Sequence, residues 1–177
     1  MNDKTDIELM ALTAQRNEKA FAELVSRYRE RLQRLAYNLL PDRAAADDAV
    51  QETFIRIWTH ARRYNPLHSV STWLYTICCR RCYDELRRHR RLRAALPQAE
   101  PIIQADAMEA AELATLLRSI ISSLPPKQRV VYQLREVEGL TAEETASATR
   151  QSLEQVKANL WAARNTVREK LKRYGIQ

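Results

Sequence analysis

Apolar residues recur at intervals of three and four along most of this chain, which is the spacing of one face of an α-helix. Alternation of apolar and polar residues, which is typical of a half-buried strand, does not persist beyond a few positions. The sequence therefore predicts an all-α fold. The predicted helices cover residues 4–15, 18–40, 43–62 and 70–92, followed by residues 107–123, 126–138, 142–148 and 153–173.

Prolines and glycines separate the predicted helices. The 177 residues include six prolines and only two glycines, which leaves little material for tight hairpins. Pro41 and Pro66 interrupt the helical pattern because proline lacks a backbone N–H and biases the preceding residue away from helix. Pro126 suits the first turn of a helix, and Gly139 suits a C-terminal cap.

Charge divides the chain into two basic blocks. The net charge is +7, and 45% of the residues are apolar, enough to build real cores. Residues 97–116 contain four acidic side chains and none that is basic, and the early part of this segment shows no strong periodicity. We therefore expect two small helical domains, residues 1–94 and 108–177, joined by a flexible linker at about 95–107.

Three cysteines lie close together on the predicted helix 70–92. At 100° per residue, Cys78 and Cys82 fall on its apolar stripe and Cys79 falls at the edge of that stripe. The sequence has no second pair of Cys or His residues with zinc-ligand spacing. We interpret the cysteines as small core side chains, with metal binding or redox sensing as the alternative.

The opposite face of the same helix is rich in arginine. Arg80 and Arg87 share a stripe with Trp73, and Arg88 lies beside it. Guanidinium groups bind phosphate bidentately and aromatic rings stack on unpaired bases, so this face predicts nucleic-acid binding. The sequence pI of about 9.6 also favours a polyanionic partner. An ordinary solvated face is the alternative, and a membrane-surface helix fits the cysteines poorly.

The pattern near the C-terminus predicts a helix-turn-helix. Thr141 with Glu144 forms one capping box, and Ser152 with Gln155 forms another, on either side of a turn at 149–152. Five apolar residues can pack as the inner faces of the two helices: Leu140, Ala146, Leu153, Val156 and Leu160. This spacing indicates DNA binding, although any two short helices can imitate it. The candidates to contact duplex DNA are Ser152, Glu154, Gln155, Lys157, Ala158, Asn159, Trp161 and Arg164.

Taken together, these blocks resemble the extracytoplasmic-function (ECF) sigma factors of bacterial RNA polymerase. The strings that carry the resemblance are DDAVQETF at 47–54, STWLY at 71–75 and LPPKQR at 124–129, in that order. The similarity extends over almost the whole chain. It implies sigma domain two at residues 1–94 and sigma domain four, with the helix-turn-helix, at residues 108–177.

The resemblance also implies two sites in the first domain. In this family the helix with DDAVQETF docks on core polymerase, and the loop before STWLY captures a base flipped from the non-template strand. Flipping costs a few kcal/mol, and stacking regains about 1–3 kcal/mol. The core-binding candidates are Asp47, Asp48, Gln51, Phe54, Ile55 and Trp58. The candidates for downstream promoter DNA are Tyr64, Asn65, Ser69, Ser71, Trp73, Arg80, Arg87 and Arg88.

Each of these sites has a plainer interpretation. The helix with DDAVQETF can be an ordinary amphipathic helix whose acids favour its N-terminal end. Trp73 can belong wholly to the core. The chain also departs from the family pattern: Arg150 replaces a common glycine, Asn159 and Ala162 replace common basic residues, and Arg80 replaces a frequent asparagine. A left-handed conformation at Arg150 would cost about 1 kcal/mol.

The expected function is that of an initiation factor. It would bind core RNA polymerase, double-stranded promoter DNA and the unpaired non-template strand. We expect no enzyme activity and no cofactor or metal, since no catalytic cluster, phosphate loop or metal-ligand set stands out. With an acidic start and no apolar run long enough to span a bilayer, we expect a cytoplasmic protein without membrane insertion.

Two questions stay open from the sequence. ECF resemblance implies an anti-sigma partner, often tethered to a membrane, but no residue identifies one. A sigma mimic or adaptor, which binds a sigma partner without reading promoters, is the alternative function, and the weakly charged outward face of residues 154–162 favours it. An ordinary helix-turn-helix repressor leaves the acid-rimmed helix at 43–62 unexplained.

Overall fold

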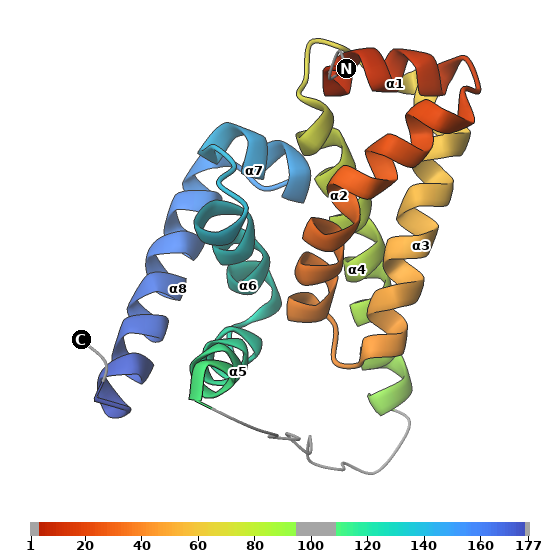
Figure 1. Ribbon diagram of the computed structural model, residues 1–177. Helices are drawn as coiled ribbons and strands as arrows, with labels where there is room; N and C mark the ends of the chain where they lie inside the picture. The colour runs from red at the N-terminus through yellow and green to blue at the C-terminus, as the bar shows by residue number, and fades with distance from the viewer. Residues whose placement is uncertain (1–3, 95–108, 176–177) are drawn as a thin grey trace.

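The first half of the chain folds into four α-helices that we call the first bundle (Figure 1). The computed structural model describes residues 4–94 and 109–175. The helices of the first bundle are α1 (Asp6–Ala14), α2 (Glu18–Leu39), α3 (Arg43–His60) and α4 (Val70–Ala94), with a 3-10 turn, η1 (Ala61–Arg63), after α3. Asn17 and Asp42 cap the starts of α2 and α3, because each side chain accepts a hydrogen bond from a backbone N–H of the first turn.

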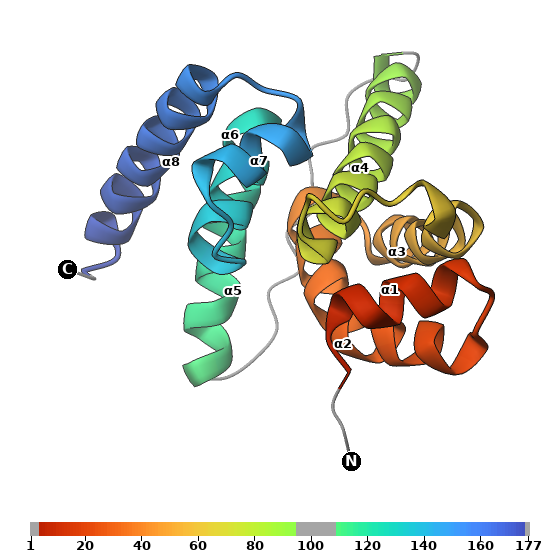
Figure 2. The ribbon, with the colours of Figure 1, turned by 90° about the horizontal axis from the view of Figure 1, so that it is seen from above.

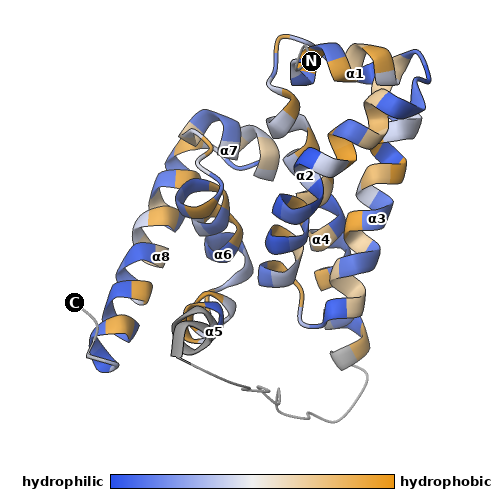
Figure 3. Ribbon diagram, viewed as in Figure 1, coloured by the Kyte–Doolittle hydropathy of each residue, from blue (hydrophilic) through white to orange (hydrophobic). Residues whose placement is uncertain are grey.

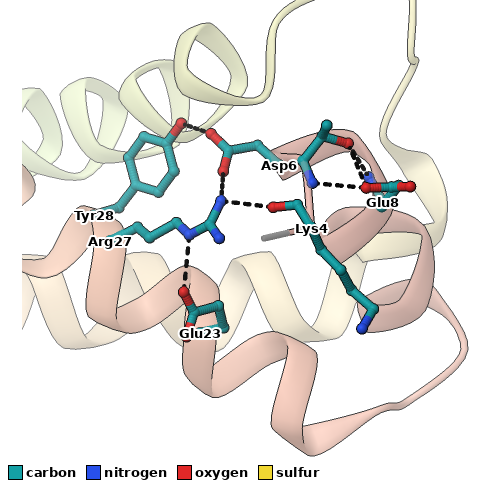
Figure 4. Close-up of polar contacts among 7 residues, drawn as sticks. Lys4, Asp6, Glu8, Glu23, Arg27 and Tyr28 are labelled. Atoms are coloured by element: carbon teal, nitrogen blue, oxygen red, sulfur yellow. Dashed lines mark hydrogen bonds and ion pairs between the residues drawn. The ribbon is translucent and has the colours of Figure 1, made fainter. Parts of the chain in front are cut away.

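Helix α1 is fixed to α2 by a small polar cluster (Figure 4). The Asp6 carboxylate accepts hydrogen bonds from Arg27 and from the hydroxyl of Tyr28. Arg27 also donates to the backbone carbonyl of Lys4 and pairs with Glu23 one turn earlier. Burial and the neighbouring Asp6 raise the pKa of Tyr28 above its usual value. The cluster sets how the N-terminal helix crosses the bundle.

The core of the first bundle lies between α2, α3 and α4. Figure 3 shows hydrophobic stretches on all three helices, and their buried side chains include Leu32, Ile57 and Leu74. The cysteines Cys78, Cys79 and Cys82 are fully buried, as expected of small core side chains. Burial raises the pKa of the Cys79 thiol well above its usual value, which keeps it protonated and unreactive.

The second half of the chain forms a second bundle. Its elements are α5 (Glu109–Ser122), α6 (Pro126–Tyr132), a π-helical turn η2 (Gln133–Val137), α7 (Ala142–Thr149) and α8 (Leu153–Arg173). Pro126 begins α6 and Gly139, with φ of 73°, follows η2, as the sequence predicts. Helices α5, α6 and α8 enclose Ile120, Leu124, Ala163 and Val167.

The all-α prediction is confirmed, and the predicted helices agree closely with those observed. Both capping boxes of the helix-turn-helix are present. One inner-face residue was predicted wrongly: Leu153 is 37% exposed, whereas Val156 and Leu160 are buried. Leu153 is the first residue of α8 after its cap, at the end of the contact between α7 and α8. The expected linker at 95–107 lies outside the described residues, and the domain boundaries stay a prediction.

The two bundles lie side by side, with α7 against α4 and α6 against α2 (Figures 1 and 2). Apolar packing continues from one bundle to the other, because Leu134 and Ala148 belong to the same buried cluster as Leu39 and Leu74. This contact, which we call the seam, also carries polar bonds. Its polar residues are Arg31, Arg34, Asn38, Ser69, Thr72 and Tyr75 on the first bundle, and Arg129, Gln133, Glu138 and Glu144 on the second.

Candidate functional site

A groove of about 700 Å³ runs between α2 and α3. Five of the six core-binding candidates line it: Asp47, Gln51, Phe54, Ile55 and Trp58. Ile55 is 56% exposed, so a large apolar side chain of this groove faces solvent. Asp48 is exposed but lies outside the lining of the groove, because one residue along the helix turns its side chain by about 100°.

Aromatic rings form the wall of this groove. Phe21 of α2 lies against Trp58 at a ring-centroid distance of 5.0 Å and against Phe54 at 6.5 Å. At the other end, the hydroxyl of Tyr37 donates a 2.6 Å hydrogen bond to Asp47. The groove therefore combines an aromatic wall with a rim of mixed charge, in which Glu18 and Asp47 lie with Arg29 and Arg43, and it suits an amphipathic helix.

The loop before α4 holds the downstream candidates. Tyr64 and Trp73 meet edge to face with centroids 5.6 Å apart, and the Tyr64 hydroxyl bonds to the carbonyl of His68 at 2.5 Å. Ser69 caps the start of α4. Its carbonyl accepts a hydrogen bond from the Trp73 N–H, and its hydroxyl accepts one from the Thr72 N–H. Trp73 is half-buried, so it both packs on the core and presents an edge.

The arginines of α4 divide into two groups. Arg88 forms an ion pair with Glu85 at 2.7 Å, and Arg81 one with Glu52 at 3.2 Å. Arg80 and Arg87 have no carboxylate partner within residues 4–94 and 109–175, and they line a pocket at the seam. Two of the three predicted arginines are therefore available for phosphate, and the third is engaged within its own helix.

Helix α8 presents four of its eight candidates freely: Glu154, Lys157, Ala158 and Trp161 are exposed. Trp161 is the most prominent, with 70% of its surface exposed. The other four take part in internal bonds: Ser152 and Gln155 cap the helix, Asn159 donates to Gln151, and Arg164 pairs with Glu136. The bonds of these four side chains would have to be exchanged or shared before they could read a base.

Arg150 ends α7 in the left-handed conformation, with φ of 56° and ψ of 38°. The left-handed conformation whose cost was considered above is therefore present at Arg150. Burial, and secondarily the nearby charge of Arg150, lower the pKa of Arg80. The turn of the helix-turn-helix thus holds backbone strain next to a like charge.

Sequence reasoning missed the most deeply buried charge of the second bundle. The side chain of Glu138 is fully buried, and it binds Tyr75 at 2.6 Å and two arginines of α2. Tyr75 was not among the predicted site residues. Glu138 lies four and eight residues after the buried Leu134 and Val130, so an acid on the apolar stripe was the available signal.

Comparison with known proteins identifies both bundles. Residues 24–92 match Sigma-70 region 2, and residues 114–167 match Sigma-70, region 4. The chain belongs to the ECF sigma factors of RNA polymerase. It is 31% identical to the ECF RNA polymerase sigma factor SigE of Mycolicibacterium smegmatis over 88% of its own length and 63% of that protein. It is 26% identical to SigW of Bacillus subtilis, over 88% of this chain and 91% of SigW.

Two solved structures share this fold. RpoE of Bartonella quintana, solved in complex with the anti-sigma factor NepR, superposes with a TM-score of 0.77 at 22% identity over 87% of this sigma factor and 98% of that chain. CnrH, solved with the cytosolic domain of CnrY, gives a TM-score of 0.73 at 24% identity over 94% and 97% of the two chains. None of the helices described in this sigma factor is long and apolar enough to cross a bilayer.

Proposed function

We propose that this sigma factor directs core RNA polymerase to specific promoters and helps to open them. One observation supports this above all: regions two and four each fall on a separate bundle, and each bundle presents a candidate surface suited to its role. In this proposal the chain acts by binding, and the polymerase adds the nucleotides. Its place of action is then the cytoplasm, beside the polymerase.

The groove between α2 and α3 is the proposed docking site for core polymerase. Exposed Ile55 next to Phe54 and Trp58 supplies the apolar centre of a binding site. Asp47 and Gln51 supply a polar rim that orients a basic helix. A few buried apolar residues with such a rim carry most of the affinity at protein interfaces.

The loop before α4 is the proposed site for the unpaired strand. Tyr64 and Trp73 provide aromatic surface for a base, and Ser69 and Ser71 provide hydroxyls. Arg80 and Arg87 can neutralise the phosphates that follow along α4. In the second bundle, α8 is the proposed reader of duplex DNA, with Lys157 on phosphate and Ala158 and Trp161 near the bases.

The second candidate function is a sigma mimic that binds a sigma partner without reading DNA. The internal bonds of Gln155 and Asn159 favour it, because these are the side chains best suited to adenine. Arg80 and Arg87 favour the initiation factor, because neither has a carboxylate partner among the residues that the structure describes. An anti-sigma partner of the kind solved with RpoE and CnrH fits either function.

Transcription by purified core polymerase separates these functions. The template is a set of fragments from the source genome, with and without the chain. An initiation factor gives discrete run-off products that depend on the chain. A mimic binds its partner and gives none. The groove variant Ile55→Asp serves as the matched negative control, because it changes an exposed position and should abolish the products without unfolding the protein.

A further inference from the structure

The carboxylate of Glu144 connects the starts of two helices that belong to different bundles. One oxygen accepts the backbone N–H of Thr141 at 2.9 Å, which completes the cap of α7. The other oxygen accepts the hydroxyls of Ser69 at 3.1 Å and Thr72 at 2.9 Å, at the start of α4. The pKa of Glu144 is lowered by the Thr141 backbone bond first and also by these hydroxyls. An acid of the second bundle therefore occupies the loop proposed to receive the DNA strand.

The start of α4 is a favourable place for an anion or an electron-rich acceptor. It is the positive end of a 25-residue helix, and the hydroxyls of Ser69 and Thr72 lie there 2.6 Å apart. A phosphate or base of the promoter strand would need the same donors that Ser69 and Thr72 give to Glu144. The carboxylate and the strand both offer oxygen or nitrogen acceptors to these two hydroxyls. They therefore cannot bind there at the same time.

Glu138 provides a second connection between the bundles. Its buried carboxylate accepts from Arg31 at 3.3 Å, Arg34 at 3.1 Å and Tyr75 at 2.6 Å, all on the first bundle. A carboxylate buried without such partners costs several kcal/mol, so this side chain is stable either in the arginine socket or in water. The Glu138 side chain therefore favours two positions of the second bundle, one packed against the first bundle and one separated from it.

The seam also contains features that make release feasible. Part of it consists of hydrogen bonds that water can replace, such as Asn38 to Gln133 at 2.8 Å, beside the apolar contacts of Leu134 and Ala148. Beside it lies an unfilled pocket of about 480 Å³. The cations that line this pocket are Arg80, Arg87, Lys127 and Arg150, with Asp84 as the acid among them. Repulsion among these cations opposes the closed arrangement.

We propose that the second bundle masks the strand-binding loop of its own chain: Glu144 takes the place of the DNA strand at Ser69 and Thr72, and Glu138 in its arginine socket holds the mask in place. The proposal rests on the function proposed above for this loop. The exposed face of α8 stays accessible in the closed form. Duplex binding is therefore permitted before the seam opens, and strand capture only afterwards.

The test compares two double variants of the full chain that remove the same charge. Glu138→Gln with Glu144→Gln weakens both connections, and the glutamine at 144 preserves the capping box. Glu143→Gln with Glu169→Gln removes two exposed acids of the same bundle and serves as control. The probe is a fluorescein-labelled single-stranded DNA 20-mer of mixed sequence, measured by anisotropy. Small-angle X-ray scattering gives the radius of gyration, and circular dichroism checks helicity.

We expect the seam variant to bind the probe about tenfold more tightly than the control, as it would if nine-tenths of the chains are closed. Its radius of gyration should also increase, with unchanged helicity. Equal affinities and equal radii for the two variants would overturn the proposal. If the seam variant loses helicity, Tyr75→Phe replaces it, because this change weakens the same connection. No gain in DNA binding by Tyr75→Phe would then overturn the proposal. Failure of the proposed function is distinct, because it appears as missing run-off products with the unaltered chain.

Discussion

Tyr75 donates a 2.6 Å hydrogen bond to Glu138, and this bond joins the centre of the first bundle to the turn before α7. Both side chains are buried, and burial together with the carboxylate raises the pKa of the tyrosine. The phenol therefore stays protonated and remains a donor at any physiological pH. Without it, the carboxylate would keep the two half-exposed arginines of α2 and a long 3.4 Å bond from the Gln133 amide.

Tyr75→Phe should lower the free energy of unfolding by about 1–3 kcal/mol, because it leaves a buried carboxylate without one of its donors. Tyr83→Phe on the same helix is the matched control. The Tyr83 hydroxyl is buried and has no partner among the described residues, so its removal should be neutral or stabilising. Urea unfolding followed by circular dichroism measures both, and equal losses would contradict this account of the seam.

Ile55→Ala should weaken binding to core polymerase about tenfold, as expected of an exposed apolar residue at the centre of an interface. Asp47→Asn should also weaken it, since Asp47 lines the groove. Asp48→Asn, outside the lining, should have a smaller effect. Biolayer interferometry with immobilised core gives the affinities, and equal effects of the two asparagine variants would show that the partner extends beyond the groove.

Lys157→Ala should weaken duplex binding to all sequences alike and reduce the salt dependence by about one phosphate contact. Trp161→Ala should instead change the preference at one or two base positions, with little effect on stability, because the ring is 70% exposed. Competition binding at two salt concentrations separates the two effects. An equal loss of affinity for all DNA sequences with Trp161→Ala would show that the ring contacts the DNA backbone and not the bases.

Arg150→Gly should stabilise the fold by about 1 kcal/mol, since glycine adopts positive φ without the Cβ clash. Arg150→Ala removes the same charge and keeps the strain, so the difference between the two variants isolates the backbone contribution. Thermal and urea unfolding provide the comparison. Equal stability of the glycine and alanine variants would mean that the strain is absorbed elsewhere.

Acid should weaken the seam through Glu144. Its pKa is lowered in the folded chain, so its contribution to stability is complete above the unfolded value of about 4.3 and is lost as the pH falls through the folded value. Urea midpoints should therefore fall on acidification below about pH 4.5. Glu144→Gln should reduce that fall, whereas Glu143→Gln should leave it unchanged.

Local patterns in the sequence carry most of the fold. Periodicity and caps define α2, α3, α4 and α8 to within a few residues, because each helix depends on its own apolar stripe and first turn. The groove candidates follow from the same periodicity, since five of six share a helix face. Only Asp48, one position out of phase with that face, lies outside the lining.

The remaining features depend on contacts between distant parts of the chain. Glu138 and Tyr75 are 63 residues apart, and no local pattern relates them. The π-helical turn at Gln133–Val137 shifts the helix register, so that Gln133 and Glu138 both enter the seam. Internal bonds likewise engage four of the eight candidates on α8, among them Gln155 and Asn159, which a helical projection alone does not reveal.

Permanganate footprinting of a promoter identified by run-off transcription tests the central claim most directly. It reports thymines that are unpaired when core polymerase and the chain are bound. We predict reactive thymines just upstream of the start site with the unaltered chain, and their loss with Trp73→Ala under conditions where core binding is retained. Promoter-specific binding with no reactive thymines, for the unaltered chain, would contradict the role of the α4 loop in opening DNA.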